Sequence, residues 1–459
     1  MQIPFDSGVL HRTPPEIWLS IFERATFVPH AFDTDEANPF DNTGIPILFD
    51  NLVEERLKAS LSAKRSLILV CKLWRELATP LLYQAVIARD NNSLRSLNDA
   101  LGWHSSASRK LRVRRFDLLR WPADQTLLAA DVLGDLFRQL PDLEILHLAT
   151  YRYYTSAHLD GHDHTRPFDT DEADSLIDTL LAAPVCTTLR KCIIGPSVIH
   201  KRQSNVLLSR CTQLCCLFVF ADLRQPFREA LWQVIPTQSL LTCMSVEHRE
   251  MHLADLSRDP NPLVPSLRHI HLRLFTLWNG RGVDAVAFLR VQGACLRTVQ
   301  IDMCGYSGTL KQCLPLFAEH CPNLTHLIFI VDHRTKKNFP LQFTYLPPTV
   351  THLGIYIQDG VYTQDNGGPE RTLCEYLQRL HECFEHQDMT LSAVPGVIRR
   401  LNPSTEEQWA CLRGDAELLA RYAALPVPPH CRLEDDQGRD LMSLLHNLGQ
   451  SQGNLPSGS

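Results

Sequence analysis

Apolar positions recur along the middle of the chain in one short pattern, an apolar residue followed by others three and five positions later. The pattern occurs nine times between residues 113 and 355, and seven of its eight steps span 25 to 30 residues. Because the later positions alternate, each unit predicts a short strand. The units begin at Val113, Leu143, Leu189, Leu214, Leu241, Leu267, Leu296, Leu324 and Val350.

Helical patterns fill the stretches between these strands. One strand and one helix in about 27 residues bury too little apolar surface alone, so neighbouring units must stack into a solenoid with a continuous core. Cys186, Cys211 and Cys321 each stand three residues before the first leucine of a unit, which indicates thiols packed inside the turns. The pattern resembles the leucine-rich repeat, LxxLxL, in its cysteine-containing class. The predicted helices cover residues 131–140, 172–182, 282–293 and 309–320.

A different pattern precedes the repeats. In RTPPEIWLSIFERAT, Thr13 is predicted to cap a helix that opens with two prolines, and Glu16 completes a capping box. In SLILVCKLWRELATPLLY a dense apolar stripe predicts a second helix, which Pro80 kinks or ends. YQAVIARD then predicts a strand that leads into the array. Helices this apolar cannot form a sufficient core alone, so they pack on the first repeat or on a partner chain.

These N-terminal segments resemble an F-box: PPEIWLSIF is its opening, and residues 70–83 match its V-C-x-x-W-x-x-L-A-x-P-x-L-Y ending. Two features depart from the family pattern, Thr13 in place of the usual leucine and an insert at about residues 27–61. F-box proteins with leucine-rich repeats typically bind the small adaptor of a Skp–cullin–F-box ubiquitin ligase, and through it a cullin. The resemblance implies adaptor contacts from Pro15, Ile17, Trp18, Ile21, Phe22, Val70, Cys71, Trp74 and Leu77.

The resemblance also implies that the repeats hold a protein target. Positions +2, +4 and +6 of each unit point away from the core, and in a leucine-rich horseshoe they line the concave surface. Phe218, Phe220, Ile328 and Ile330 would form an apolar binding patch there, unless a loop covers them. An insertion at residues 150–170 adds tyrosines. The candidate target-binding residues are Phe218, Phe220, His269, His271, Arg273, His326, Ile328, Tyr151 and Tyr153.

The insert at 27–61 is acidic and turn-rich in its first half and helix-like in its second. We expect the first half either to be partly disordered or to extend the partner surface as a loop. Towards the C-terminus, GVIRRLNPS predicts one last edge strand and WACLRGDAELLARYAAL a covering helix. The predicted fold is α/β, with parallel strands on the concave side of the solenoid and helices outside. Its parts are an F-box at 12–87, the solenoid at 88–360, a cap at 361–447 and a disordered tail at 448–459.

Composition changes this picture little. The 459 residues are 44% hydrophobic and carry a net charge of −6, so nothing global draws the chain to nucleic acid or to anionic membranes. The basic run of Arg109, Lys110, Arg112, Arg114 and Arg115 is expected to be a solvated strand face. No signal peptide or membrane span is visible, which favours a cytoplasmic or nuclear protein. Fifteen cysteines in such a chain indicate reduced thiols.

No catalytic pattern is visible. In HECFEH, at 381–386, the histidines are separated by about 140° around a helix and cannot share a face. CGYSGT lacks the spacing of a nucleophile elbow, and His158, His162 and His164 match no helical ligand pair. We therefore expect no enzymatic activity, no metal and no cofactor. The alternatives to a ligase receptor are an interaction scaffold that is not coupled to a ligase, and a metal-dependent or hydrolytic enzyme.

Overall fold

In the computed structural model the chain forms two compact units. The first unit draws on residues 1–34, 51–152 and 165–214, and the second on 35–50, 153–164 and 215–459. The structure describes residues 13–35, 38–41, 52–106, 111–120, 130–150, 178–194, 209–219, 240–247, 264–273, 283–302, 308–332, 346–358, 373–378, 380, 382, 394–402, 415–425, 427, 430–445 and 447.

Three helices open the first unit: α2 (Pro15–Ala25), α3 (Leu52–Ile68) and α4 (Lys72–Tyr83). They share a small apolar core around Phe22 and Leu81, to which partly buried side chains of all three helices add. The second half of the insert is therefore helical, as its pattern predicts.

The ends of these helices differ from the sequence prediction. Pro14 has an extended backbone, because the residue before a proline avoids the helical region, so α2 begins at Pro15 without a side-chain cap. The N-cap is therefore Pro14, one residue after the Thr13 that the sequence predicts. Between α3 and α4 the chain breaks, and the Cys71 thiol accepts a hydrogen bond from the Trp74 N–H at 3.5 Å. The helix after this break continues past Pro80 to Tyr83, so the proline does not end it.

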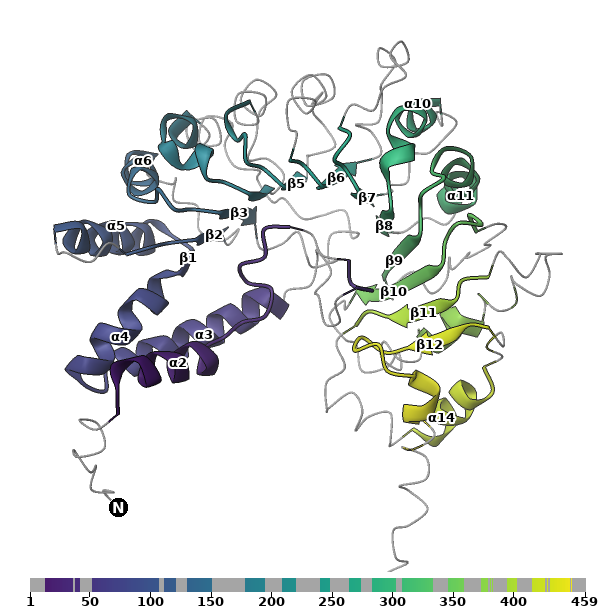
Figure 1. The fold of residues 1–459 in the computed structure, drawn as a ribbon, viewed down its shortest axis with the longest axis horizontal. Coiled ribbons are helices and arrows are strands. Elements are labelled where there is room, and N and C mark those ends of the chain that lie inside the picture. The colour runs from purple at the N-terminus through teal and green to yellow at the C-terminus, as the bar shows by residue number, and fades with distance from the viewer. Residues whose placement is uncertain are drawn as a thin grey trace, which may run out of the picture. The chain divides into compact units, whose positions relative to one another are not determined.

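Parallel strands follow the helices in chain order (Figure 1). The first unit contains β1 (Ala85–Ala88), β2 (Arg115–Arg120), β3 (Ile145–Thr150) and β4 (Lys191–Ile194). The second unit contains β5 (Cys216–Val219), β6 (Cys243–Glu247), β7 (His269–Arg273), β8 (Thr298–Asp302), β9 (His326–Asp332), β10 (His352–Gln358), β11 (Val397–Arg400) and β12 (Arg432–Glu434). Within each unit, every strand pairs in parallel with the next.

The helices lie on one face of these strands (Figure 1). In the first unit they are α5 (Asn91–Ser106) and α6 (Ala130–Arg138), followed by the 3-10 turn η3 (Pro184–Thr187). In the second unit they are α10 (Val283–Gln292), the 3-10 turn η7 (Gly293–Cys295), α11 (Gly308–His320) and, near the C-terminus, α14 (Ala416–Ala423). Three of the predicted repeat helices, at 131–140, 282–293 and 309–320, are thereby confirmed.

The repeat pattern predicts the strands closely. Each of the nine units forms a strand that begins two residues after its first apolar position, from β2 to β10. The strand expected after the α4 helix is β1. GVIRRLNPS forms β11, but β12 pairs with it, so the prediction that β11 is the edge strand was wrong. The parallel strands, with a helix or turn between them, are consistent with a leucine-rich-repeat solenoid.

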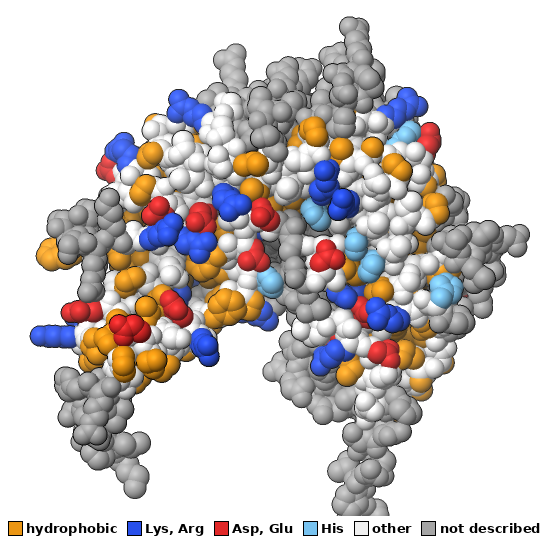
Figure 2. All heavy atoms as spheres, in the orientation of Figure 1, with side chains coloured by type: hydrophobic (Ala, Val, Ile, Leu, Met, Phe, Trp, Pro, Cys, Tyr) orange, Lys and Arg blue, Asp and Glu red, His pale blue; other side chains and the backbone are white. Residues whose placement is uncertain are grey.

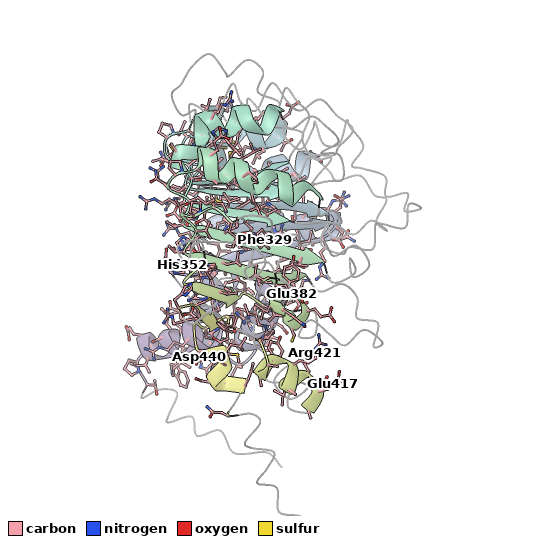
Figure 3. The ribbon with its side chains drawn as sticks, turned by 90° about the vertical axis from the view of Figure 1, so that its right-hand side faces the viewer. Phe329, His352, Glu382, Glu417, Arg421 and Asp440 are labelled. Carbon is pink, nitrogen blue, oxygen red and sulfur yellow. The ribbon has the colours of Figure 1, made fainter. Side chains whose placement is uncertain are left out.

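The core of each repeat is made by the apolar positions that define it. In the unit of β9, the side chains of Leu324, Leu327 and Phe329 are all buried, and Figure 3 labels Phe329 on its strand. Cys186, Cys211 and Cys321 are buried and free of disulfides, as their recurrent position predicts. Burial raises the pKa of the Cys321 thiol to about 12, so it packs as a small neutral group.

Two buried amides join neighbouring repeats of the second unit. Gln292 accepts from the N–H of Val264 at 3.1 Å and donates to its carbonyl at 2.8 Å. Asn402 makes the same pair of bonds to Ile357, both at 2.7 Å. Each amide satisfies a backbone donor and acceptor that would otherwise be buried unpaired, so the turns stack in one register. Among the described residues, no helix combines the length and apolarity needed to cross a membrane.

Candidate functional site

The helices of the first unit keep an apolar surface after their own core is filled. Ile17, Ile21, Leu69 and Val70 are exposed by 51%, 46%, 75% and 49%, and we call these four residues the helix surface. They lie on α2 and in the break between α3 and α4. Figure 2 shows hydrophobic side chains gathered over this helical part. Sequence reasoning did not select Leu69, because the stripe was expected to continue as a helix through it.

The predicted adaptor-binding residues divide between this surface and the core beneath it. Phe22 is only 1% exposed and lies between Trp18 and Trp74, with ring centroids 6.2 and 4.8 Å away. The two indoles enclose it, so Phe22 belongs to the core of the helices and not to their exposed surface. Trp18 and Trp74 also contact each other at 5.1 Å and are partly buried. These three rings support the helix surface from below.

The remaining predicted residues of this group are placed as follows. Pro15 is exposed at the first position of α2, and Leu77 is partly buried on α4. Cys71 is partly buried and caps α4 through its sulfur. The break at Cys71 and the turn of α4 after it therefore set the position of Val70 and Leu69.

In its first half, the insert is described at residues 27–35 and 38–41. Its first part packs into the first unit, where Val28 and Ala31 share an apolar core with Leu57 and Ala85. The expectation of disorder was wrong for these residues, because they bury apolar side chains. The remaining residues of its first half lie outside the described part of the chain.

An arginine of the repeats holds this first part, and we call the contact the first anchor. Arg115 Nη1 donates to the carbonyl of Ala31 at 2.9 Å, while its Nε donates to the Asp117 carboxylate at 2.9 Å. Both charged side chains are buried, so the prediction of a solvated basic face was wrong for Arg115. The neighbouring guanidinium of Arg114 lies 5.0 Å from the ring centroid of Phe32.

The second described part of the insert is a tight turn, Asn38–Asp41, which we call the docking turn. The Asn38 side-chain oxygen accepts from the N–H of Phe40 at 3.0 Å, and its carbonyl accepts from the N–H of Asp41 at 3.0 Å. Asparagine at the first position and proline at the second are residues that this kind of turn favours, since one bonds its own backbone and the other presets φ. The turn is therefore specified by four consecutive residues.

The ring of Phe40 lies on two histidines of the second unit. Its centroid is 5.2 Å from those of His326 and His352, which stack on each other at 4.5 Å. Phe40 is 9% exposed. A Cβ at Gly354 would come within 3.2 Å of the tip of the Phe40 ring and within 2.6 Å of a methyl group of Leu401. Glycine at this strand position therefore leaves room for both the Leu401 methyl and the end of the ring.

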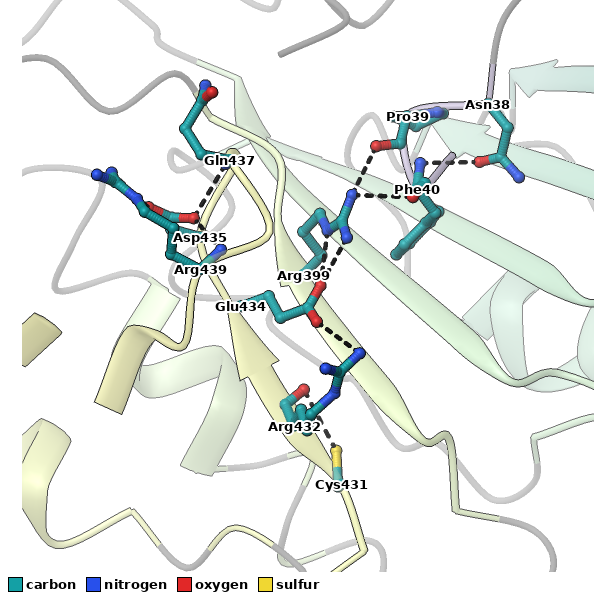
Figure 4. A network of polar contacts seen from close by, with 10 residues as sticks. All are labelled: Asn38, Pro39, Phe40, Arg399, Cys431, Arg432, Glu434, Asp435, Gln437 and Arg439. Atoms are coloured by element: carbon teal, nitrogen blue, oxygen red, sulfur yellow. Dashed lines mark hydrogen bonds and ion pairs between the residues drawn. The ribbon is translucent and has the colours of Figure 1, made fainter. Parts of the chain in front are cut away.

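Arg399 binds the backbone of the docking turn (Figure 4). Its Nη1 donates to the carbonyls of Pro39 at 2.8 Å and Phe40 at 3.3 Å. Its Nε and Nη2 donate to the Glu434 carboxylate at 3.0 and 2.6 Å, and Arg432 contacts the other oxygen of that carboxylate at 2.9 Å. Glu434 therefore fixes the guanidinium on one side so that its remaining donors face the turn.

The two histidines form a neutral platform. Burial lowers the pKa of His326 to about 4, and the positive charge of Arg399 and the neighbouring His352 and His269 act in the same direction. The pKa of His352 is also lowered, again chiefly by burial. Thr325 and Thr351 each bond the ring of the following histidine at 2.8 Å, which fixes the orientation of both rings. At neutral pH the pair is thus an uncharged aromatic surface.

The other candidate target-binding residues are less accessible than predicted. Phe218 and Ile328 are each 1% exposed, so the prediction of an exposed apolar patch was wrong for them and for Ile330, which is also buried. The alternative, that this patch is covered, fits their burial. His271 is buried, while His269 is partly exposed.

The structure does not describe the side chains of the other four candidate target-binding residues. The backbone of Arg273 lies in β7, in register with Glu247 and Asp302 of the adjacent strands. Phe220, Tyr151 and Tyr153 lie outside the described residues.

Sequence reasoning missed the residues that form the docking contact, Phe40, Arg399 and Glu434. The signal that was available is the turn sequence Asn-Pro-Phe-Asp inside the insert, which places an aromatic side chain on a preset turn. Nothing in the linear pattern pairs it with strands more than 350 residues away along the chain, such as Arg399 at a separation of 360 from Pro39.

The arrangement is suited to binding a chain segment. It offers guanidinium donors for backbone carbonyls and an aromatic platform for one ring. Among the described residues, no group of three or more His, Cys, Asp or Glu side chains is arranged to hold a metal ion. The histidines at 158, 162 and 164 lie outside those residues.

No protein-family model matches the sequence, and no curated protein does either. Among solved structures, a leucine-rich repeat-containing protein from Legionella pneumophila, LegL7, is 11% identical over 82% of this chain and 92% of its own, with a TM-score of 0.31. Yeast Rad7 in complex with Elc1 is 11% identical over 70% of this chain and 97% of that chain, with a TM-score of 0.19. TM-scores this low support no conclusion, so the fold assignment rests on the strands, their register and their burial.

Proposed function

We propose that this chain is the substrate-recognition subunit of a Skp–cullin–F-box ubiquitin ligase. In this role α2–α4 form the F-box and bind a Skp-type adaptor, the adaptor links the chain to a cullin, and the repeats hold a protein target. Ubiquitin transfer belongs to other subunits, so the chain carries out no bond chemistry and needs no cofactor. Its place of action is the cytoplasm or the nucleus.

One observation carries the adaptor part of the proposal. Phe22, Ala78 and Leu81 already fill the core of the three helices, yet Ile17, Ile21, Leu69 and Val70 remain exposed. Large apolar side chains that folding does not use are typical of protein-binding surfaces. The F-box resemblance of residues 70–83 places Val70 at the start of its motif.

The test is co-purification with a Skp-type adaptor after co-expression. Ile17→Asp together with Val70→Asp should abolish adaptor binding, because two buried carboxylates in an apolar interface without partners are strongly unfavourable. Both side chains are exposed in the free chain, so the thermal stability should stay close to that of the wild type. Trp74 is a poor choice for mutation, since it packs on Phe22.

Leu240→Asp is the matched control, because Leu240 is an exposed apolar residue of the second unit. This variant should bind the adaptor as the wild type does. A folded wild-type chain that fails to bind any Skp-type adaptor would refute the ligase role and leave the alternative, a leucine-rich-repeat scaffold that is not coupled to a ligase.

A further inference from the structure

The docking turn is a self-contained element. Both of its internal hydrogen bonds connect residues within Asn38–Asp41, and proline presets its backbone. A separate polypeptide with the same four residue types can therefore form the same turn.

The repeats contact this turn through features that any such polypeptide would share. Arg399 binds two backbone carbonyls, and His326 and His352 receive one aromatic ring. Gly354 leaves space for the end of that ring. None of these contacts uses a side chain of the turn other than Phe40.

The site also has a preference for the residue that follows the ring. Asp41 is exposed, and its negative charge acts on both His326 and His352 in the direction opposite to Arg399. The residue that follows the ring is therefore electrostatically coupled to the histidine pair, and an acidic residue there opposes the effect of Arg399 on both imidazoles.

We infer that the face formed by His326, His352, Gly354 and Arg399 is a binding site for target proteins that present an exposed turn of the form Asn-Pro-aromatic-acidic, and that the docking turn occupies this site as an internal stand-in. That the bound protein is a target of a ubiquitin ligase rests on the proposed function. That the face binds such a turn does not depend on the proposed function.

The internal turn competes with an external one through its high effective concentration. A tethered segment experiences a local concentration in the millimolar range, so a free peptide reaches the site only in excess or when the internal ring is removed. Target binding and release of the insert from this site are then the same event.

The experiment uses a synthetic peptide with the sequence of residues 35–44, DEANPFDNTG, and saturation-transfer NMR on its phenylalanine ring. The full chain with Phe40→Ala should transfer at least about fivefold more saturation to the peptide than the wild type does, because the site is vacant. A control peptide with alanine in place of both Asn38 and Pro39 keeps the ring but loses the turn, and should give a signal near that of the wild-type chain.

A second variant shows whether any effect of Phe40→Ala arises from misfolding. Asn38→Gly with Pro39→Gly loosens the internal turn while leaving Phe40 in place, and should also bind the peptide better than the wild type. Adding Gly354→Ala to Phe40→Ala should reduce the gain, because the added methyl would crowd the position of the ring tip at 3.2 Å. Equal signals from the wild type and both opened receptors, with native circular dichroism, would overturn the inference.

Adaptor binding by the same preparations separates this inference from the proposed function. Phe40 lies outside the helix surface, so Phe40→Ala should co-purify with the adaptor like the wild type. Peptide binding without adaptor binding would refute only the ligase role. Adaptor binding without a difference in peptide binding would refute only the docking site.

Discussion

The insert contacts the repeats of each unit through an arginine, and the two contacts differ in what surrounds them. In both contacts, a buried carboxylate binds the guanidinium. Another nitrogen of the same guanidinium donates to a carbonyl of the insert. At the first anchor the neighbouring side chains form an apolar core that includes Leu57, Ala85 and Phe32. At the docking turn they are histidines and a glycine that leave room for one ring.

This difference teaches that the same backbone contact can serve two purposes. Apolar packing around Val28 and Ala31 is part of a core and resembles the interior of any repeat. A ring placed on a pair of neutral imidazoles is instead a specific aromatic contact, with Gly354 beside the end of the ring. We interpret the first anchor as structural and the second as a recognition site.

The largest expected effect distinguishes the two arginines. Arg115→Met leaves the buried Asp117 carboxylate without its partner and should lower the free energy of unfolding by about 4 kcal/mol. Arg399→Met should cost less, about 3 kcal/mol, because Arg432 still contacts Glu434. Urea titration followed by circular dichroism measures both. A larger loss for Arg399 than for Arg115 would contradict the assignment of the first anchor as the structural one.

Filling the space under the ring should loosen the docking turn. Gly354→Ala places a methyl group against Phe40 and Leu401, a form of overpacking that costs about 1–3 kcal/mol. Faster hydrogen exchange at the amide of Phe40, which bonds Asn38, would report the change. Gly102→Ala, in α5 with no atom near the added methyl, is the matched control and should leave that amide unchanged.

The neutral state of the platform gives a pH dependence. The pKa of His326 is lowered to about 4 by burial and by His352, His269 and Arg399, against the opposing charge of Asp41. Because protonation is disfavoured while the site is closed, the docked state should weaken as the pH falls from about 6.5 toward 4. An NMR titration should find a higher pKa for His326 in Phe40→Ala than in the wild type.

His147 provides the reference in that titration. It is buried in the first unit, and burial lowers its pKa to about 4 as well. Because the docking turn belongs to the other unit, the pKa of His147 should be the same in both proteins. A shift of both histidines would indicate a general loosening of the fold and not the removal of one ring.

The smallest effect concerns the threonine that holds the platform. Thr325→Val removes the hydrogen bond to the His326 ring and should weaken docking by about 0.5–1 kcal/mol. Hydrogen exchange at Phe40 is again the measure. Thr187→Val removes a local bond to Pro184 in the first unit and should have no effect there.

The strands and their faces could be predicted because each depends on neighbours in sequence. The +3 and +5 spacing found Leu327 and Phe329, and both are buried as predicted. The same alternation put Ile328 on the opposite face, where it was expected to be exposed. Ile328 is buried. It lies beside Gly354, and Phe40 of the insert lies close to the same glycine. Local periodicity assigns a residue to a face but does not reveal what covers that face.

The helix surface shows the same division. The apolar stripe predicted that Ile17, Trp18 and Phe22 are important to the helical part. It did not separate those that fill the core from those that stay exposed. The break at Leu69–Cys71 decides this, since it turns α4 so that Trp74 encloses Phe22 while Val70 and Leu69 remain outside.

By itself, the sequence determined the repeat and its period, the strands β1–β11 and the buried thiols. All of these follow from residues within one repeat or one turn, whose energies are set by nearby positions. Only the tertiary structure decided that the insert lies against the repeats and that Arg399 binds Pro39. That contact joins residues 360 positions apart, and it forms because a buried guanidinium must satisfy donors that Glu434 leaves unused.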